Sequence, residues 1–140
     1  MDLLNVINYL VPINLVLTIW LTFKQVAIDN QNLRLNLYEK RYHIYEKTIS
    51  FLREFLRASI SGDLQDNMAD ILYEYKVNVH QSIFLFDDEI EEYLLKIYTR
   101  AEIMYGKGRR EQDYISEVEW LEEQIVESRK IFKPYMKFKK

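Results

Sequence analysis

The sequence contains no cysteine, and it has only three glycines and two prolines in 140 residues. The missing thiols exclude disulfide scaffolds, thiolate zinc sites, iron–sulfur clusters and thiol catalysis. The scarcity of glycine and proline disfavours a turn-rich β-sandwich and a glycine-rich phosphate-binding loop. Hydrophobic residues make up 49% of the chain and charged residues 29%, a composition typical of a chain that folds as one domain.

Catalytic and metal-binding patterns are also missing. The two histidines, His43 and His80, form no H-x-x-x-H or E-x-x-H spacing. The acidic cluster at residues 87–92 is explained by the favourable position of carboxylates at a helix N-terminus. We therefore expect no catalytic residue, no cofactor and no metal ion, and a protein that is not an enzyme.

The longest uncharged stretch has 21 residues, from Leu3 to Phe23. As a helix it would span about 30 Å, which is the thickness of the bilayer hydrocarbon. It lacks the basic n-region and the small-residue cleavage pattern of a signal peptide. A buried core helix is the alternative, but the remaining chain is too short to cover such a helix on every side. We expect a retained membrane anchor over residues 1–28, with Trp20 near an interface.

Basic residues set the expected orientation. Neither residue before the uncharged segment is basic, whereas four basic residues follow it closely: Lys24, Arg34, Lys40 and Arg41. Because positive residues stay in the cytoplasm, the N-terminus should lie outside and residues 24–140 inside.

One half of the anchor circumference is polar and carries Asn5, Asn8, Asn14, Thr18 and Thr22. Asparagine amides in lipid need partners, which other helices or water can supply. This face therefore predicts self-association, and a narrow water-filled path is a weaker possibility. In the alternative interpretation, Asn5 and Asn8 lie at the headgroups while Asn14 and the threonines bond to their own backbone.

Helical periodicity covers the rest of the chain. Between Tyr38 and Leu56, apolar residues recur at alternating spacings of four and three, which predicts a coiled-coil-like seam. Three further amphipathic segments follow, and a third-helix seam is predicted at Ile90, Leu94, Ile97, Ala101 and Met104. The apolar run at residues 83–86 is interpreted as a core plug between helices, with a short strand as the alternative.

Together these patterns predict an all-α fold, in which an N-terminal transmembrane helix continues into an antiparallel bundle of about four helices at residues 29–132. A basic aromatic tail at residues 133–140 would then return to the membrane. Its expected membrane-surface residues are Lys130, Lys133, Tyr135, Lys137, Phe138, Lys139 and Lys140. A solvated, partly disordered terminus is the alternative.

Partner candidates follow from charge. Five glutamates are either a solvated face or a docking surface for a basic cytoplasmic protein: Glu117, Glu119, Glu122, Glu123 and Glu127. The acidic body of the chain argues against nucleic-acid binding. Binding of a small anionic ligand between subunits, by Arg109, Arg110 or the tail, is a further alternative.

Two segments, LNLYEKRYHIYEKTISFL and IFLFDDEIEEYLLKIY, occur with a late Trp120 and an F-x-P-Y-M motif at residues 132–136. In this combination the chain resembles a group of small uncharacterised bacterial proteins with one N-terminal transmembrane helix and a helical cytoplasmic domain. The resemblance implies a bacterial inner-membrane setting and carries over no functional residue.

The sequence thus predicts a non-enzymatic, single-pass, membrane-anchored interaction or scaffold protein that self-associates and docks a partner at the cytoplasmic face of the membrane. The alternative is a membrane effector, such as a signal-gated pore or membrane-disrupting subunit of a stress or phage-defence system. Its cytoplasmic bundle would sense a ligand or partner.

Overall fold

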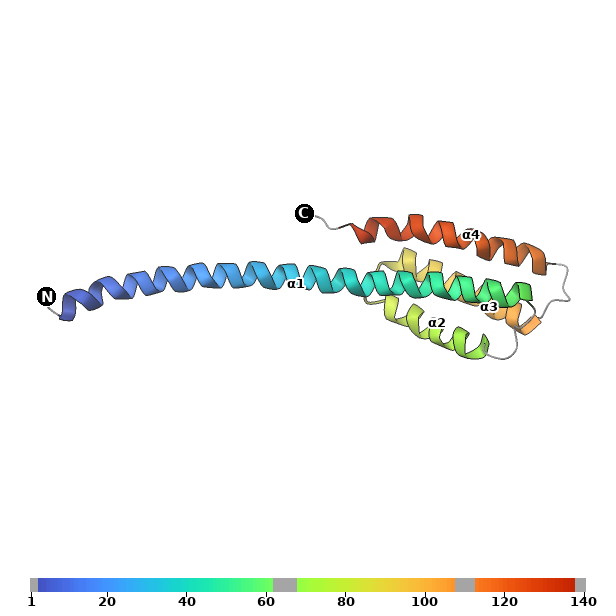
Figure 1. Ribbon diagram of the computed structural model, residues 1–140, viewed down its shortest axis with the longest axis horizontal. Helices are drawn as coiled ribbons and strands as arrows, with labels where there is room; N and C mark the ends of the chain where they lie inside the picture. Colours follow the sequence, from blue (N-terminus) through green and yellow to red (C-terminus); the bar gives the residue numbers. More distant parts are fainter. Residues whose placement is uncertain (1–2, 62–67, 108–112, 138–140) are drawn as a thin grey trace. The chain divides into compact units, whose positions relative to one another are not determined.

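A computed structural model of the chain describes residues 3–61, 68–107 and 113–137 (Figure 1). Over these residues the fold is all-α, as predicted, and contains no strand. Its elements are α1 (Leu3–Ser61), α2 (Met68–Ser82), α3 (Asp88–Lys107), α4 (Tyr114–Phe132) and the 3-10 helix η1 (Lys133–Met136).

The chain divides into two compact units, Met1–Asn36 and Leu37–Lys140. The helix α1 contributes residues to both units and contains Pro12. The division falls later than the predicted end of the anchor at residue 28, and the intervening residues 29–36 are all exposed. The predicted tail begins with η1, which packs against α4.

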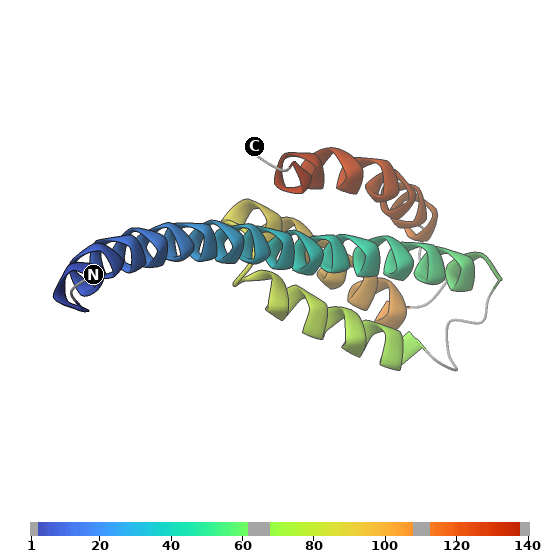
Figure 2. The same ribbon diagram turned by 60° about the vertical axis from the view of Figure 1, so that its left-hand side comes forward.

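The second unit encloses the hydrophobic core. In both Figure 1 and Figure 2, α2, α3 and α4 lie beside the part of α1 that ends at Ser61. The helix α3 packs against both α2 and α4. The predicted seam of α3 is confirmed, because all five of its residues are buried: Ile90, Leu94, Ile97, Ala101 and Met104. This regular apolar stripe explains why α3 is the shared partner.

The buried face of α1 is wider than its predicted seam. Ile44, Thr48 and Phe55 are buried although they lie off that seam, whereas Tyr42 lies on it and is 45% exposed. The reason is that α1 is contacted from two sides. The ring of Phe51 stacks on Tyr75 of α2 with centroids 4.0 Å apart, and the ring of Tyr45 lies 5.5 Å from Phe132 of α4.

The apolar run at residues 83–86 is a turn between α2 and α3, and the interpretation as a core plug is only half right. Leu85 and Phe86 pack against the core, but Ile83 is 43% exposed and Phe84 is 88% exposed. The backbone N–H groups of Leu85 and Phe86 both donate to the carbonyl oxygen of Ser82, at 2.9 and 3.0 Å. This tight reversal points two side chains inward and two outward.

Candidate functional site

The apolar stretch of α1 is uncovered within the chain. Its large apolar side chains from Val11 to Ile28 are between 49% and 74% exposed. By length and composition this part of α1 can cross a membrane, and none of its apolar stretch is buried. Exposed apolar surface of this extent is typical of membrane or protein contact.

The polar face of this stretch is partly satisfied by its own backbone. The hydroxyl of Thr18 donates to the backbone carbonyl oxygen of Asn14 at 2.7 Å. The hydroxyl of Thr22 likewise donates to the backbone carbonyl oxygen of Thr18 at 2.8 Å. These two hydrogen bonds agree with the alternative interpretation, in which the threonines bond to the backbone of their own helix. The Asn14 side chain is exposed, and within the described part of the chain its amide makes no hydrogen bond. The side chains of Asn5 and Asn8 lie outside the described residues.

A cation–π pair follows the apolar stretch. The ammonium of Lys24 lies 4.4 Å from the centre of the Trp20 ring. Tryptophan and lysine are both common where a membrane helix meets the headgroups. Next to Lys24, the amide of Gln25 donates to the Asp29 carboxylate at 3.1 Å, so polar side chains appear on this part of the helix, although Val26, Ile28 and Leu33 are also exposed there.

In the second unit, a cluster of five residues joins three segments that are distant in sequence. This junction cluster consists of Arg41, Leu85, Phe86, Phe132 and Tyr135. The guanidinium of Arg41 lies 5.6 Å from the ring centres of both Phe86 and Tyr135. Phe86 in turn meets Phe132 edge-on at 5.2 Å and Tyr135 at 5.3 Å. The cluster therefore fixes η1 and the α2–α3 turn to α1.

The start of the predicted tail thus packs on the protein beside Phe132, the last residue of α4. Phe132 is fully buried, and Tyr135 and Met136 pack against the core. The hydroxyl of Tyr135 donates to the carboxylate of Asp87, and this hydrogen bond raises the pKa of Tyr135 to about 12. Lys133 and Lys137 are exposed, and Phe138, Lys139 and Lys140 lie outside the described residues.

The five candidate docking glutamates do not form one uniform surface. Glu117 pairs with Arg100 at 3.6 Å, and Glu127 pairs with Lys130 at 2.9 Å. Arg100 also lies 4.1 Å from the Trp120 ring centre. The remaining three, Glu119, Glu122 and Glu123, are exposed on α4. Their spacing places them on one side of the helix, which leaves a smaller acidic surface than predicted.

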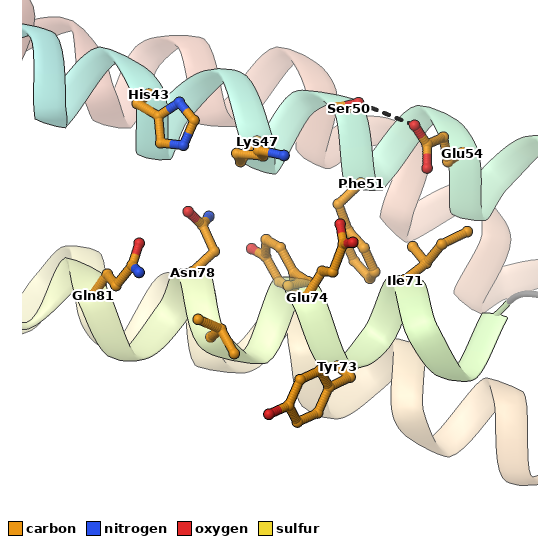
Figure 3. Close-up of a pocket in the computed structure, with 12 residues that line it drawn as sticks. His43, Lys47, Ser50, Phe51, Glu54, Ile71, Tyr73, Glu74, Asn78 and Gln81 are labelled. Atoms are coloured by element: carbon orange, nitrogen blue, oxygen red, sulfur yellow. Dashed lines mark hydrogen bonds between the residues drawn. The ribbon is translucent and has the colours of Figure 1, made fainter.

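A pocket of about 330 Å³ lies between α1 and α2 (Figure 3). The lining carries side chains of both charge signs. His43, Lys47 and Glu54 come from α1, and Glu74 comes from α2 on the opposite side. The hydroxyl of Ser50 donates to the Glu54 carboxylate at 3.2 Å. The lining therefore selects neither an anion nor a cation by charge.

Buried polar groups beside this pocket were not apparent from the sequence. The Asn78 amide donates to the carbonyl oxygen of Ile44 at 3.4 Å, and the Thr48 hydroxyl donates to the same oxygen at 2.9 Å. Burial raises the pKa of the Tyr75 hydroxyl well above its ordinary value. The Asn78 contact connects α2 to α1, whereas the buried Tyr75 hydroxyl has no hydrogen-bond partner among the described residues.

The arrangement offers no metal site, since no three histidine or acidic side chains converge anywhere in the described ranges. The predicted small-ligand residues Arg109 and Arg110 lie outside those ranges. Comparison with known proteins returns no match to a family profile, to a curated protein or to a solved structure.

Proposed function

We propose that this protein is a non-enzymatic, single-pass, membrane-anchored interaction protein whose helical second unit docks a partner at the cytoplasmic face. The observation that carries the proposal is the exposure of every large apolar side chain described from Val11 to Ile28. Each buried Å² of apolar surface contributes about 25 cal/mol, so leaving this stretch in water would be costly. A bilayer covers its apolar residues up to Phe23, with the Trp20–Lys24 pair at one headgroup layer.

The proposed orientation places the second unit in the cytoplasm. Lys24, Arg34, Lys40 and Arg41 all follow the apolar stretch within a short distance, and the positive-inside rule counts basic residues in that zone. In this arrangement α1 continues from the bilayer into the folded unit as one helix.

We further propose an antiparallel arrangement of the four helices. At the start of α4, the Tyr114 hydroxyl donates to the carbonyl oxygen of Ser59 near the end of α1, at 3.1 Å. At the end of α4, Phe132 contacts Tyr45, which lies earlier in α1. These two contacts support opposite directions for α1 and α4.

Self-association through the anchor is the second part of the proposal. The hydroxyls of Thr18 and Thr22 already bond to their own helix, so the Asn14 amide is the described group that gains most from a partner. A second copy supplies that partner without a water-filled path. The exposed surface formed by Glu119, Glu122 and Glu123 is proposed as the docking site for a basic protein partner.

The pocket between α1 and α2 gives no reason to propose catalysis. Its only serine, Ser50, donates to a carboxylate at 3.2 Å. A carboxylate can act as the base for a nucleophilic serine when a third group orients it, and no such group contacts Glu54 among the described residues.

Membrane extraction tests the anchor. Full-length protein should stay in the membrane pellet after alkaline carbonate washing, whereas the variant I13R/L17R, with two charges in the apolar stretch, should be released. The matched control is Y73R/I115R, which adds the same two charges at exposed positions of the second unit. Release of the unmodified protein by carbonate, at the level of I13R/L17R, would refute the proposal.

A further inference from the structure

The part of α1 that belongs to the first unit carries a regular repeat of residues on one side of the helix. The members of this repeat recur at alternating spacings of three and four residues, which is the a/d pattern of a coiled coil. They are Asn14, Leu17, Leu21, Lys24, Ile28, Gln31 and Leu35. We call these seven residues the anchor seam. The predicted coiled-coil seam that begins at Tyr38 continues the same register.

A bilayer can cover only part of the anchor seam. All seven residues are exposed within the chain, and the four aliphatic ones are between 46% and 53% exposed. Leu35 follows Phe23 by 12 residues, which corresponds to about 18 Å of α-helix. A headgroup layer is only about 5–8 Å thick. The apolar side chain of Leu35 is therefore left in water unless another protein surface covers it.

Two amides in the anchor seam favour a partner that carries the same residues. The side chains of Asn14 and Gln31 are exposed, and within the described part of the chain their amides make no hydrogen bond. An amide both donates and accepts, so an identical amide at the same height can satisfy it. Asn14 lies at an a position, where asparagine fixes the register of parallel coiled coils. Both amides therefore fit a second copy of this chain better than an apolar helix of another protein.

Membrane anchoring sets the direction of such a pair. Two copies that are anchored by the same stretch of α1 leave the bilayer in the same direction, so their identical residues lie at the same depth. Lys24 is the only charged member of the anchor seam, and its ammonium lies 4.4 Å from the ring centre of Trp20 in its own helix. This contact keeps the charge at the headgroup layer, where the high dielectric weakens repulsion from Lys24 of a second copy.

We infer that a second copy of this chain packs in parallel and in register along the anchor seam, and that the resulting coiled coil continues beyond the bilayer to Leu35. The inference rests on the proposed anchoring and self-association, and it adds the contact residues and their direction. Ile28 and Leu35 each meet the same residue of the second copy, which covers two apolar side chains beyond the hydrocarbon. Membrane helix pairs and soluble coiled coils share a crossing angle near 20°, so one geometry serves both parts.

The absence of cysteine makes the test direct, because each single-cysteine variant of the full-length protein carries one thiol. Membranes containing each variant would be oxidised with copper phenanthroline, and the covalent dimer measured on non-reducing gels. Identical seam positions of a parallel pair face each other closely enough for a disulfide. Each seam residue has a matched control two residues earlier, an exposed aliphatic residue about 200° around the helix. The pairs are L21C with I19C, I28C with V26C, and L35C with L33C.

We expect several-fold more covalent dimer from L21C, I28C and L35C than from their controls. If only L21C exceeds its control, the coiled coil beyond the bilayer is wrong and the proposed self-association of the anchor stands. More dimer from V26C and L33C than from I28C and L35C also overturns the inference, because the interface then lies on the other side of α1. Equal dimer within all three pairs contradicts both the inference and the proposed self-association. Carbonate washing of the same membranes tests the anchoring separately, and release of the unmodified protein overturns the parallel pair as well.

Discussion

Arg41 donates a hydrogen bond from Nε to the backbone carbonyl oxygen of Leu85, 44 residues away in the sequence, at 2.8 Å. The same guanidinium lies against the rings of Phe86 and Tyr135. One side chain near the start of the second unit therefore holds both the α2–α3 turn and the C-terminal η1. In the sequence Arg41 appeared only as one of several basic residues that set orientation.

Removing this side chain should loosen the junction cluster. We expect R41A to lower the free energy of unfolding of the second unit by about 1–3 kcal/mol, since a charge-assisted hydrogen bond and two cation–π contacts are lost. R41K should recover only part of the loss, because an ammonium does not present a flat face to both rings. Urea unfolding in detergent, followed by circular dichroism, measures the change.

The adjacent exposed residue provides the control. K40A should stay within about 0.5 kcal/mol of the unmodified protein. Equal unfolding curves for R41A and K40A would show that the Arg41 contacts contribute nothing to stability.

A buried and an exposed phenylalanine should differ in their contribution to the free energy of unfolding. Phe55 is fully buried and Phe84 is almost fully exposed. We expect F55A to lower the free energy of unfolding by about 3–5 kcal/mol through lost burial and a residual cavity. In detergent, F84A should change it by less than about 0.5 kcal/mol. A comparable loss in both variants would mean that the core is not organised as described.

High pH should destabilise the second unit through Tyr93. The Tyr93 hydroxyl lies 2.9 Å from the Ser128 hydroxyl and donates to the carbonyl oxygen of Gln124. Burial of this hydroxyl, and to a smaller extent the nearby Glu127 carboxylate, raises the pKa of Tyr93 to about 12. Between pH 10 and 12 the unfolded chain loses this proton while the folded chain keeps it. Stability is therefore complete below pH 10 and falls as pH rises toward 12.

The comparison between Y93F and the unmodified protein isolates this effect. Thermal unfolding midpoints measured from pH 8 to pH 11 should fall less steeply above pH 10 for Y93F, although its midpoint at pH 8 is lower because hydrogen bonds are lost. Parallel curves for the two proteins would contradict the assignment of a raised pKa to Tyr93.

Self-association should depend on amides of the anchor and not on its threonines. We expect the unmodified protein to be an oligomer in mild detergent, and N5L/N8L/N14L to shift toward monomer, because interhelical amide bonds contribute about 1 kcal/mol each. T18V is the control, since the Thr18 hydroxyl already bonds to Asn14 of its own helix. The oligomeric mass of each variant is measured by light scattering. An unchanged mass for the triple variant would show that the asparagines do not contribute to the interface.

Local periodicity was sufficient to predict the helical segments and the α3 seam, because α3 presents one regular stripe to its neighbours. It did not predict the width of the α1 face, which depends on contacts with Tyr75 and Phe132 from two other helices. It also missed the outward direction of Phe84, since hydrophobicity alone does not show which side of a turn a residue occupies. Partners such as Asn78 and Ile44 are 34 residues apart and leave no local pattern.

The central claim is that α1 crosses a membrane and places the second unit in the cytoplasm. It is tested most directly by labelling single-cysteine variants D2C and I115C in intact bacterial spheroplasts with a membrane-impermeant maleimide, and again after lysis. The account predicts that D2C is labelled in intact cells and that I115C is labelled only after lysis. Labelling of I115C in intact cells, or protection of both positions until lysis, would contradict it.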